Sequence, residues 1–239
     1  GRIIRELGAN LYVHPAAGDS GGAVGAALLH YHALGHPLGV AMTSAYLGPA
    51  YDDARIATAI GDAGFEAVDT YDDEASLVQA TAALLAENKV IGWYQGRSEW
   101  GPRALGHRSI IANPTRAEMQ GVVNERIKFR EPFRPFAPAV PLDQAEAYFD
   151  MPPVTSDCAP EFFMLAVHPV RPAMRSVIPA VTHADGTARV QVVSESSNPL
   201  FCRLLYEFGA ITGVPVLMNT SFNLRGEPVV ETPEDALNT

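Results

Sequence analysis

Residues 92–138 read GWYQGRSEWGPRALGHRSIIANPTRAEMQGVVNERIKFREPFRPFAP and concentrate positive charge on an otherwise acidic chain. The stretch holds 8 basic and 4 acidic residues, a net charge of +4, whereas the remaining 9 basic and 23 acidic residues carry −14. Most of its cations are arginines, whose planar donors grip phosphate or carboxylate with two hydrogen bonds at once. The stretch therefore predicts a local site for small anions.

Two kinds of position are mixed in this stretch. Arg116 and Arg126 are explained by a place on a solvent-exposed helix face. The same explanation is an alternative to a binding role for Arg130. It accounts poorly for Arg103, Lys128 and Arg134, which lie in loops interrupted by glycine or proline, where binding groups gather. In the second loop we expect three aromatic residues to anchor the chain to the core while the cations face outward: Phe129, Phe133 and Phe136.

Composition narrows the class of protein. The 239 residues suit one large or two small domains, and 47% hydrophobic with 18% charged residues is ordinary for a soluble globular chain. A net charge of −10 argues against broad binding of nucleic acid or anionic membrane. Two cysteines, Cys158 and Cys202, make no disulfide framework and fit a reducing cytoplasm. No apolar run reaches the ~20 residues that span a bilayer.

Periodicity and turn residues predict an α/β fold. Helices are expected over residues 22–34, 53–63, 73–87, 115–126, 143–149 and 199–213, and strands over 11–13, 65–68, 90–94, 109–112, 137–140, 161–167, 188–193 and 214–218. Thr115 and Glu118 form a capping-box pattern that predicts the start of the fourth helix. The chain opens on Gly1 rather than on Met, and a helix that starts near Pro233 is cut at Thr239, so we expect a piece of a longer protein.

Three further positions suggest binding, each with a structural alternative. In GDSGG, Asp19 and the glycines open a helix, which can hold an anion or can merely form a capped turn. Arg189 lies in an apolar strand, either at a sheet edge or facing a cleft. Asn219 and Ser221 in NTSFN follow a buried strand and can bind a ligand or close an Asx-turn. No Walker loop and no G-x-S-x-G elbow is present.

The chain resembles the carbamoyltransferase family of nodulation proteins and antibiotic O-carbamoyltransferases. The resembling stretches are VHPAAGDSGGAVGAAL, GWYQGRSEWGPRALGHRSI, NERIKFREPFRPFAPAV, THADGTARVQVV and PVLMNTSFNLRGEPVVETPEDAL, in order along the chain. The resemblance implies that residues 1–50 are the tail of a Kae1-like, actin-related domain with its last strand, loop and helix. Residues 51–239 are then a YrdC-like domain, a twisted mixed sheet flanked by helices.

The resemblance also implies a reaction. Carbamoyl phosphate and ATP give carbamoyl adenylate in the YrdC-like domain, and the carbamoyl group then passes to a hydroxyl of a small acceptor near Fe²⁺ in the Kae1-like domain. By motif, the cations for carbamoyl phosphate are Arg103, Lys128, Arg134 and Arg189. Asn219 and Ser221 complete that pocket, Gly21 and Gly22 face the adenylate, and Asp19 is a metal ligand. The family's metal-binding histidines lie upstream of the matching residues, so iron is expected only in a full-length protein.

Other readings are weaker. A YrdC-type nucleic-acid-binding module would need a wide basic face, which the charge of −10 disfavours. A threonylcarbamoyl-adenylate synthase is disfavoured by the GDSGG segment ahead of the second domain. We therefore expect a cytoplasmic enzyme with no nucleic-acid or membrane partner. The sequence does not identify the acceptor and leaves open whether the protein forms a homodimer.

Overall fold

A computed structural model describes residue 6 and residues 11–39, 42–65 and 68–239 of the chain. Its centre is a six-stranded sheet made of β1 (Ile91–Tyr94), β2 (Arg108–Ala112), β3 (Ala137–Pro141), β4 (Ala166–Pro169), β5 (Thr187–Val193) and β6 (Leu217–Ser221). The spatial order is β1-β2-β6-β3-β5-β4. Only β3 and β5 run parallel among these neighbours, so the sheet is mixed and the predicted α/β class is confirmed.

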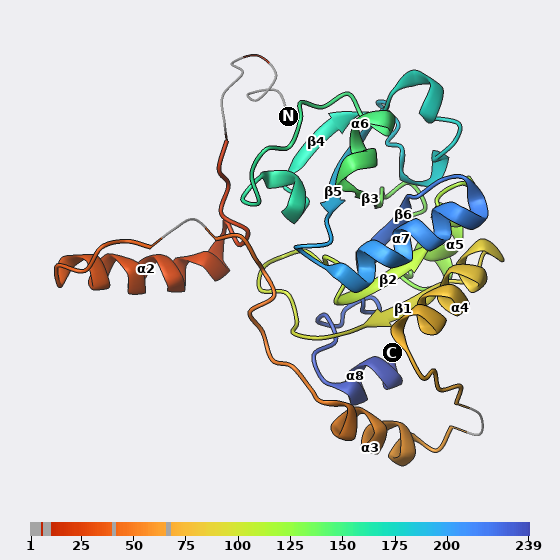
Figure 1. Cartoon of the computed structure of the whole chain (residues 1–239), viewed down its shortest axis with the longest axis horizontal. Coiled ribbons are helices and arrows are strands. Elements are labelled where there is room, and N and C mark those ends of the chain that lie inside the picture. Colours follow the sequence, from red (N-terminus) through yellow and green to blue (C-terminus); the bar gives the residue numbers. More distant parts are fainter. Residues whose placement is uncertain (1–5, 7–10, 40–41, 66–67) are drawn as a thin grey trace.

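Seven helices accompany the sheet in the described part of the chain: α2 (Asp19–Ala33), α3 (Asp53–Ala63), α4 (Glu74–Ala86), α5 (Met119–Arg126), α6 (Ala145–Tyr148), α7 (Pro199–Thr212) and α8 (Pro233–Asn238). Figure 1 shows α4 and α7 side by side across one face of the sheet, with α3 and α8 together at one end. Asp52, Asp73 and Asn198 each cap a helix by accepting a backbone N–H, as residues of this type do.

Two large apolar clusters form the core, and alternation along β5 separates them. Ala188, Val190 and Val192 belong to the cluster that includes α5 and α6, whereas Val193 joins the cluster under α4 and α7. The predicted period of two for this strand is therefore confirmed. Arg189 and Gln191 share the face of Val193, and this is also the face of Asn219 of β6, on the other side of β3.

Helix α2 projects from the body of the protein and has no buried residue (Figure 1). Its first turn needs Gly21, because a Cβ there would lie 2.3 Å from the carbonyl oxygen of Ala16. The strand predicted over 11–13 does not form: these residues have no regular structure. A strand needs a hydrogen-bonded neighbour, and the described residues offer none here.

Four other expected elements differ from the structure. The fourth helix begins at Met119 and not at the predicted capping box, because the Thr115 hydroxyl donates to Oδ1 of Asn113 instead. Residues 160–163 form a 3₁₀ turn, so the strand expected over 161–167 begins only at Ala166, as β4. The strand expected over 214–218 is shifted to β6. Residues 66 and 67 of the strand expected over 65–68 lie outside the described residues, and residues 65 and 68 are not in a strand.

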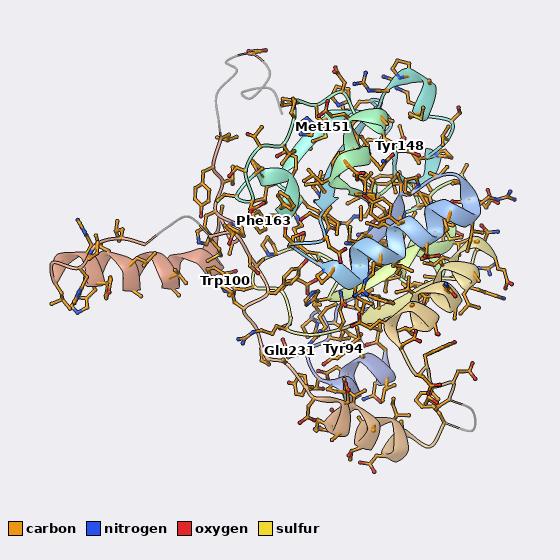
Figure 2. The ribbon with its side chains drawn as sticks, in the orientation of Figure 1. Tyr94, Trp100, Tyr148, Met151, Phe163 and Glu231 are labelled. Atoms are coloured by element: carbon orange, nitrogen blue, oxygen red, sulfur yellow. The ribbon has the colours of Figure 1, made fainter. Side chains whose placement is uncertain are left out.

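The linker ahead of α3 is fastened to the loop that follows β1. Gly48 N–H donates to the carbonyl of Ser98, and Trp100 N–H donates to the carbonyl of Ala45. Figure 2 places Trp100 near the base of α2, where its ring meets His14 edge-on with centroids 5.3 Å apart. Within the described ranges, no helix combines the length and the apolar character needed to cross a membrane.

Candidate functional site

A cleft of about 280 Å³ collects four arginines from three separate parts of the chain. Its lining includes Arg103 of the loop after β1, Arg130 and Arg134 of the loop after α5, and Arg189 of β5. Asn219 and Ser221 of β6 line the same cleft. The structure thus brings together five of the six residues predicted for the anion pocket.

The sixth, Lys128, lies in an adjoining cavity of about 230 Å³, which shares Arg130, Arg134 and Ser221 with the cleft. Its ammonium donates to the carbonyl oxygen of Asn223 at 2.9 Å and to the side-chain Oδ1 of Asn223 at 2.8 Å. It also meets the carbonyl and the hydroxyl of Ser221. Lys128 therefore fixes the end of β6 and adds a positive charge beside the cleft.

Sheet register explains why residues far apart in sequence meet here. Strands β5 and β6 flank β3, where Ala137 pairs with Asn219 and Ala139 pairs with Gln191. Residues paired across neighbouring strands share a face of the sheet. Because both β3 residues are alanines, the longer side chains of β5 and β6 can meet above them. Arg189 lies on this face in an interior strand, so the sheet-edge alternative for it is wrong.

The loop that carries Arg103 is held by one carboxylate. Oε1 of Glu99 accepts the backbone N–H groups of Leu105 at 2.6 Å, His107 at 2.8 Å and Arg108 at 3.3 Å. The fully buried Arg108 guanidinium also holds this loop, because it donates hydrogen bonds to the carbonyls of Gln95 and Gly96. Arg108 also lies 3.7 Å from the centroid of the Tyr94 ring, and Figure 2 shows Tyr94 beside Glu231.

The cations of the site are crowded. Burial, followed by the positive charges of Arg103 and Arg130, lowers the pKa of Arg189 to about 10. Burial, followed by the charge of Arg130, lowers the pKa of Lys128 to about 8. Burial and the charge of Arg134 lower the pKa of Arg130, while Glu131 acts in the opposite direction. A bound anion would relieve the repulsion between these cations. Such a cluster of charged groups with shifted pKa values is therefore a candidate anion site.

Three buried polar atoms of the cleft residues have no hydrogen-bond partner among the described residues. They are Nε of Arg103, Nε of Arg189 and Oδ1 of Asn219. Buried polar atoms are almost always paired in folded proteins, so unpaired ones mark places where a ligand can complete the bonding. The set offers two charged donors and one acceptor to a ligand.

Arg130 is the residue of this site that the sequence pattern left ambiguous. It lines both cavities, its Nε donates to Oδ1 of Asn124 at 2.7 Å, and its guanidinium lies 4.9 Å from the centroid of the Phe136 ring. Of the three phenylalanines expected to anchor this loop, only Phe136 is buried. Phe129 is 53% exposed and Phe133 is 79% exposed, so that expectation was wrong for both. Phe133 lies in a turn closed by the hydrogen bond from Arg134 N–H to the carbonyl of Glu131, and Phe129 has a positive φ of 45°.

The residues expected to face iron and adenylate lie elsewhere. Asp19 and Gly22 are exposed at the first turn of α2, and Gly21 is partly exposed; none of them lines the cleft. Asp19 makes no side-chain capping bond, which also removes the alternative of a helix cap. No group of three or more His, Cys, Asp or Glu side chains in the described ranges could hold a metal ion. The residues described here do not by themselves form an iron site.

Comparison with known proteins supplies the family. Residues 82–239 match the family described as carbamoyltransferase C-terminus. The chain is 42% identical over 244 residues to nodulation protein NolNO of Sinorhizobium fredii, covering 100% of this chain and 35% of that protein. It is 41% identical over 233 residues to nodulation protein NolO of Bradyrhizobium diazoefficiens, covering 96% of this chain and 41% of that protein.

A third relative is similar over almost the same part of the chain. The chain is 41% identical over 229 residues to nodulation protein U of Rhizobium tropici, covering 93% of this chain and 36% of that protein. The chain thus spans well under half the length of the curated relatives it matches. The cleft lined by the four arginines, called the arginine cleft below, lies within the matched residues, since every residue that lines it falls between 102 and 221. The chain belongs to the carbamoyltransferase C-terminus family.

Proposed function

We propose that this chain is the adenylate-forming part of an O-carbamoyltransferase. Carbamoyl phosphate binds in the arginine cleft, and ATP binds with its phosphates in the adjoining cavity beside Lys128. The carbamoyl group passes from the adenylate to a hydroxyl of a small acceptor, with iron and most of the acceptor pocket supplied by the longer protein. Family membership supports the reaction class, and the cleft supports the ligand.

The observation that carries the proposal is the set of unpartnered atoms in the cleft. The free donors of Arg103 and Arg189 suit the phosphate oxygens of carbamoyl phosphate, because guanidinium and phosphate form strong charge-assisted bonds. The free acceptor of Asn219 suits the amide N–H of the same molecule. Inorganic phosphate presents mainly acceptors at neutral pH and would leave the Asn219 oxygen poorly matched. Carbamoyl phosphate can match both kinds of group.

The atoms balance when one water enters the reaction. Water cleaves carbamoyl phosphate into carbamate and phosphate, a carbamate oxygen bonds to the α-phosphorus of ATP, and pyrophosphate leaves. Every species in this sequence except water is an anion, so fixed cations can act by neutralising charge and holding the reacting groups in line. Arg130 and Arg134 line both cavities and would act on both substrates, whereas Lys128 lines only the adjoining cavity and would act on ATP. Each such donor contributes about 2–4 kcal/mol of transition-state stabilisation in comparable sites.

Exchange of labelled pyrophosphate into ATP tests this proposal, because it reports reversible adenylate formation without an acceptor. We expect exchange that depends on carbamoyl phosphate and that falls at least about 100-fold in Arg134→Ala and Lys128→Ala. The matched control is Lys89→Ala, since Lys89 is exposed and is the only other lysine in the chain. An exchange rate that does not depend on carbamoyl phosphate would overturn the assignment. So would an exchange rate that is the same in wild type, Arg134→Ala and Lys128→Ala.

A further inference from the structure

We propose that Gln191 is a positioning residue that makes the cleft selective for an acyl phosphate bearing an N–H group. It does so by fixing the side-chain amide of Asn219 with the oxygen left free for the ligand. This inference rests on the proposed binding of carbamoyl phosphate. It adds to that proposal a reason why a methyl group would be rejected where an amino group is accepted.

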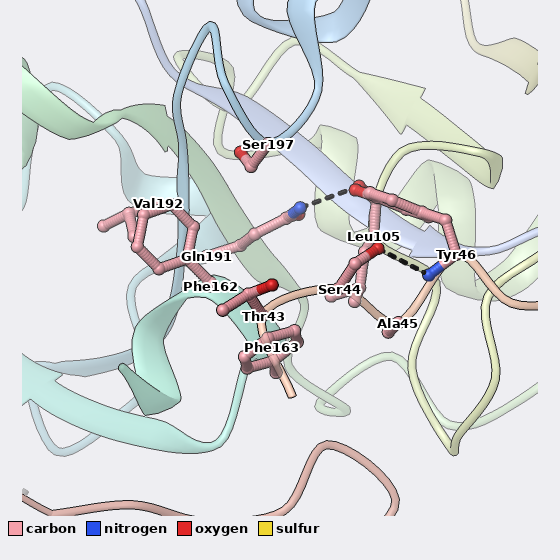
Figure 3. A pocket seen from close by; sticks show the side chains of 10 residues that line it. All are labelled: Thr43, Ser44, Ala45, Tyr46, Leu105, Phe162, Phe163, Gln191, Val192 and Ser197. Carbon is pink, nitrogen blue, oxygen red and sulfur yellow. Dashed lines mark hydrogen bonds between the residues drawn. The ribbon is translucent and has the colours of Figure 1, made fainter. Parts of the chain in front are cut away.

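Hydrogen-bond polarity along a short chain of groups carries the argument. Nε2 of Gln191 donates to the carbonyl oxygen of Leu105 at 2.8 Å, a contact visible in Figure 3. A carbonyl can only accept, so the other end of the Gln191 amide, its Oε1, is turned toward β6. There it accepts from Nδ2 of Asn219 at 2.7 Å. The orientation of one amide thereby dictates the orientation of the next.

A second carbonyl reinforces this orientation. Nδ2 of Asn219 also donates to the carbonyl oxygen of Ala104 at 3.2 Å, so both of its hydrogens have acceptors. Oδ1 of Asn219 is left without a partner, although the residue is only 1% exposed and lines the cleft. Rotating the amide would place its oxygen against two other oxygens. The free atom offered to a ligand is therefore an acceptor.

The surroundings hold this arrangement rigidly. Gln191 is 1% exposed, and Ala137 and Ala139 of β3 leave room for the two amides to meet across that strand. The Tyr46 hydroxyl donates to the same Leu105 carbonyl at 3.0 Å, which gives the carbonyl a second donor that holds it in place. Figure 3 shows Tyr46, Leu105 and Gln191 gathered around one small pocket. A buried amide held in this way cannot adapt its polarity to a ligand.

Carbamoyl phosphate and acetyl phosphate are suitable probes, because they differ by NH₂ against CH₃ at nearly the same shape. A site with a buried group built to bond a ligand N–H discriminates strongly against an analogue that lacks it. We expect the chain to bind carbamoyl phosphate at least about 30-fold more tightly than acetyl phosphate. In Gln191→Leu the Asn219 amide loses its shortest hydrogen bond. We then expect the two probes to bind with affinities that differ by no more than about threefold.

Titration calorimetry with both probes on wild type, Gln191→Leu and Gln191→Glu tests the inference. Glutamic acid at this buried position, protonated toward the Leu105 carbonyl, can donate and accept as glutamine does, so Gln191→Glu should keep the ratio. The ratio, unlike stability or overall affinity, does not change when a substitution merely loosens the fold. An unchanged ratio in Gln191→Leu, or equal binding of both probes by wild type, would overturn the role of Gln191 and leave the phosphate site intact. Binding of neither probe by wild type would remove the proposed function as well.

Discussion

The ring of Tyr46 lies flat on the imidazole of His107, with centroids 3.7 Å apart and planes 9° apart. This contact joins the linker ahead of α3 to the loop that carries Arg103. Nδ1 of His107 lies 2.6 Å from the carbonyl oxygen of Arg97, so the neutral ring carries its proton there and donates. Burial, partly opposed by that hydrogen bond and reinforced by the charge of Arg108, lowers the pKa of His107 to about 4.

The folded protein should therefore lose stability in acid through His107. Its pKa falls from 6.5 when unfolded to about 4 when folded, so the unfolded chain binds more protons between these values. The contribution of His107 to the free energy of unfolding is fully present above pH 6.5. It declines as the pH falls, by up to about 3 kcal/mol at pH 4. Urea titrations from pH 7 to pH 4 measure it.

The matched variants are His107→Phe, which keeps a flat ring but cannot titrate, and His30→Phe on the exposed face of α2. The acid-dependent loss should shrink in His107→Phe and persist in His30→Phe. Equal acid sensitivity in wild type and both variants would show that the His107 environment does not matter.

Anion affinity should fall as the pH rises through about 8, the pKa of the buried Lys128 ammonium. Inorganic phosphate is a suitable probe because its second proton is lost near pH 7, so between pH 7.5 and 9.5 its charge only becomes slightly more negative, which cannot by itself weaken binding to cations. Losing one nearby cation should weaken binding by roughly threefold to tenfold. Phosphate titrations at pH 7.5 and 9.5 measure the effect.

In Lys128→Met this part of the pH dependence should disappear, whereas Lys89→Met should behave as wild type. If phosphate affinity in wild type and Lys128→Met declines in parallel between these pH values, the charge of Lys128 is not part of the site.

Replacing Glu99 by Ala should loosen the loop that presents Arg103. Three backbone N–H groups would lose their common acceptor, which costs roughly 3 kcal/mol of unfolding free energy. Carbamoyl phosphate affinity should fall too, although Glu99 does not line the cleft. Glu118→Ala removes an exposed carboxylate from the same stretch and should change neither quantity. Normal stability with normal affinity in Glu99→Ala would contradict the role assigned to this carboxylate.

The sequence was most informative where physical chemistry is local. Arg103 and Arg134 lie in loops interrupted by glycine and proline, and Arg189 breaks an apolar alternation, so each was recognisable as a candidate without coordinates. Their meeting in one cleft depends on β3 and β6 pairing between β2 and β5. Nothing in the local pattern specifies that order.

Other features arise from tertiary contacts that no short window contains. The strand over β6 extends through Asn219 to Ser221 because these polar residues pair with β2, whereas hydrophobicity alone ends the strand at Met218. Thr115 satisfies Asn113 and not a helix terminus. The polarity of the Asn219 amide is imposed by carbonyls of residues 104 and 105, more than 100 positions upstream.

Binding of carbamoyl phosphate to wild type, Arg189→Gln and Arg116→Gln is the most direct test of the central claim that the arginine cleft is the substrate site. Arg189 has an unpartnered buried Nε in the cleft, whereas Arg116 pairs with Glu118 on the surface and serves as the matched control. Calorimetry should show binding by wild type and Arg116→Gln and a loss of about 30-fold or more in Arg189→Gln. Equal affinity in all three proteins would contradict the account.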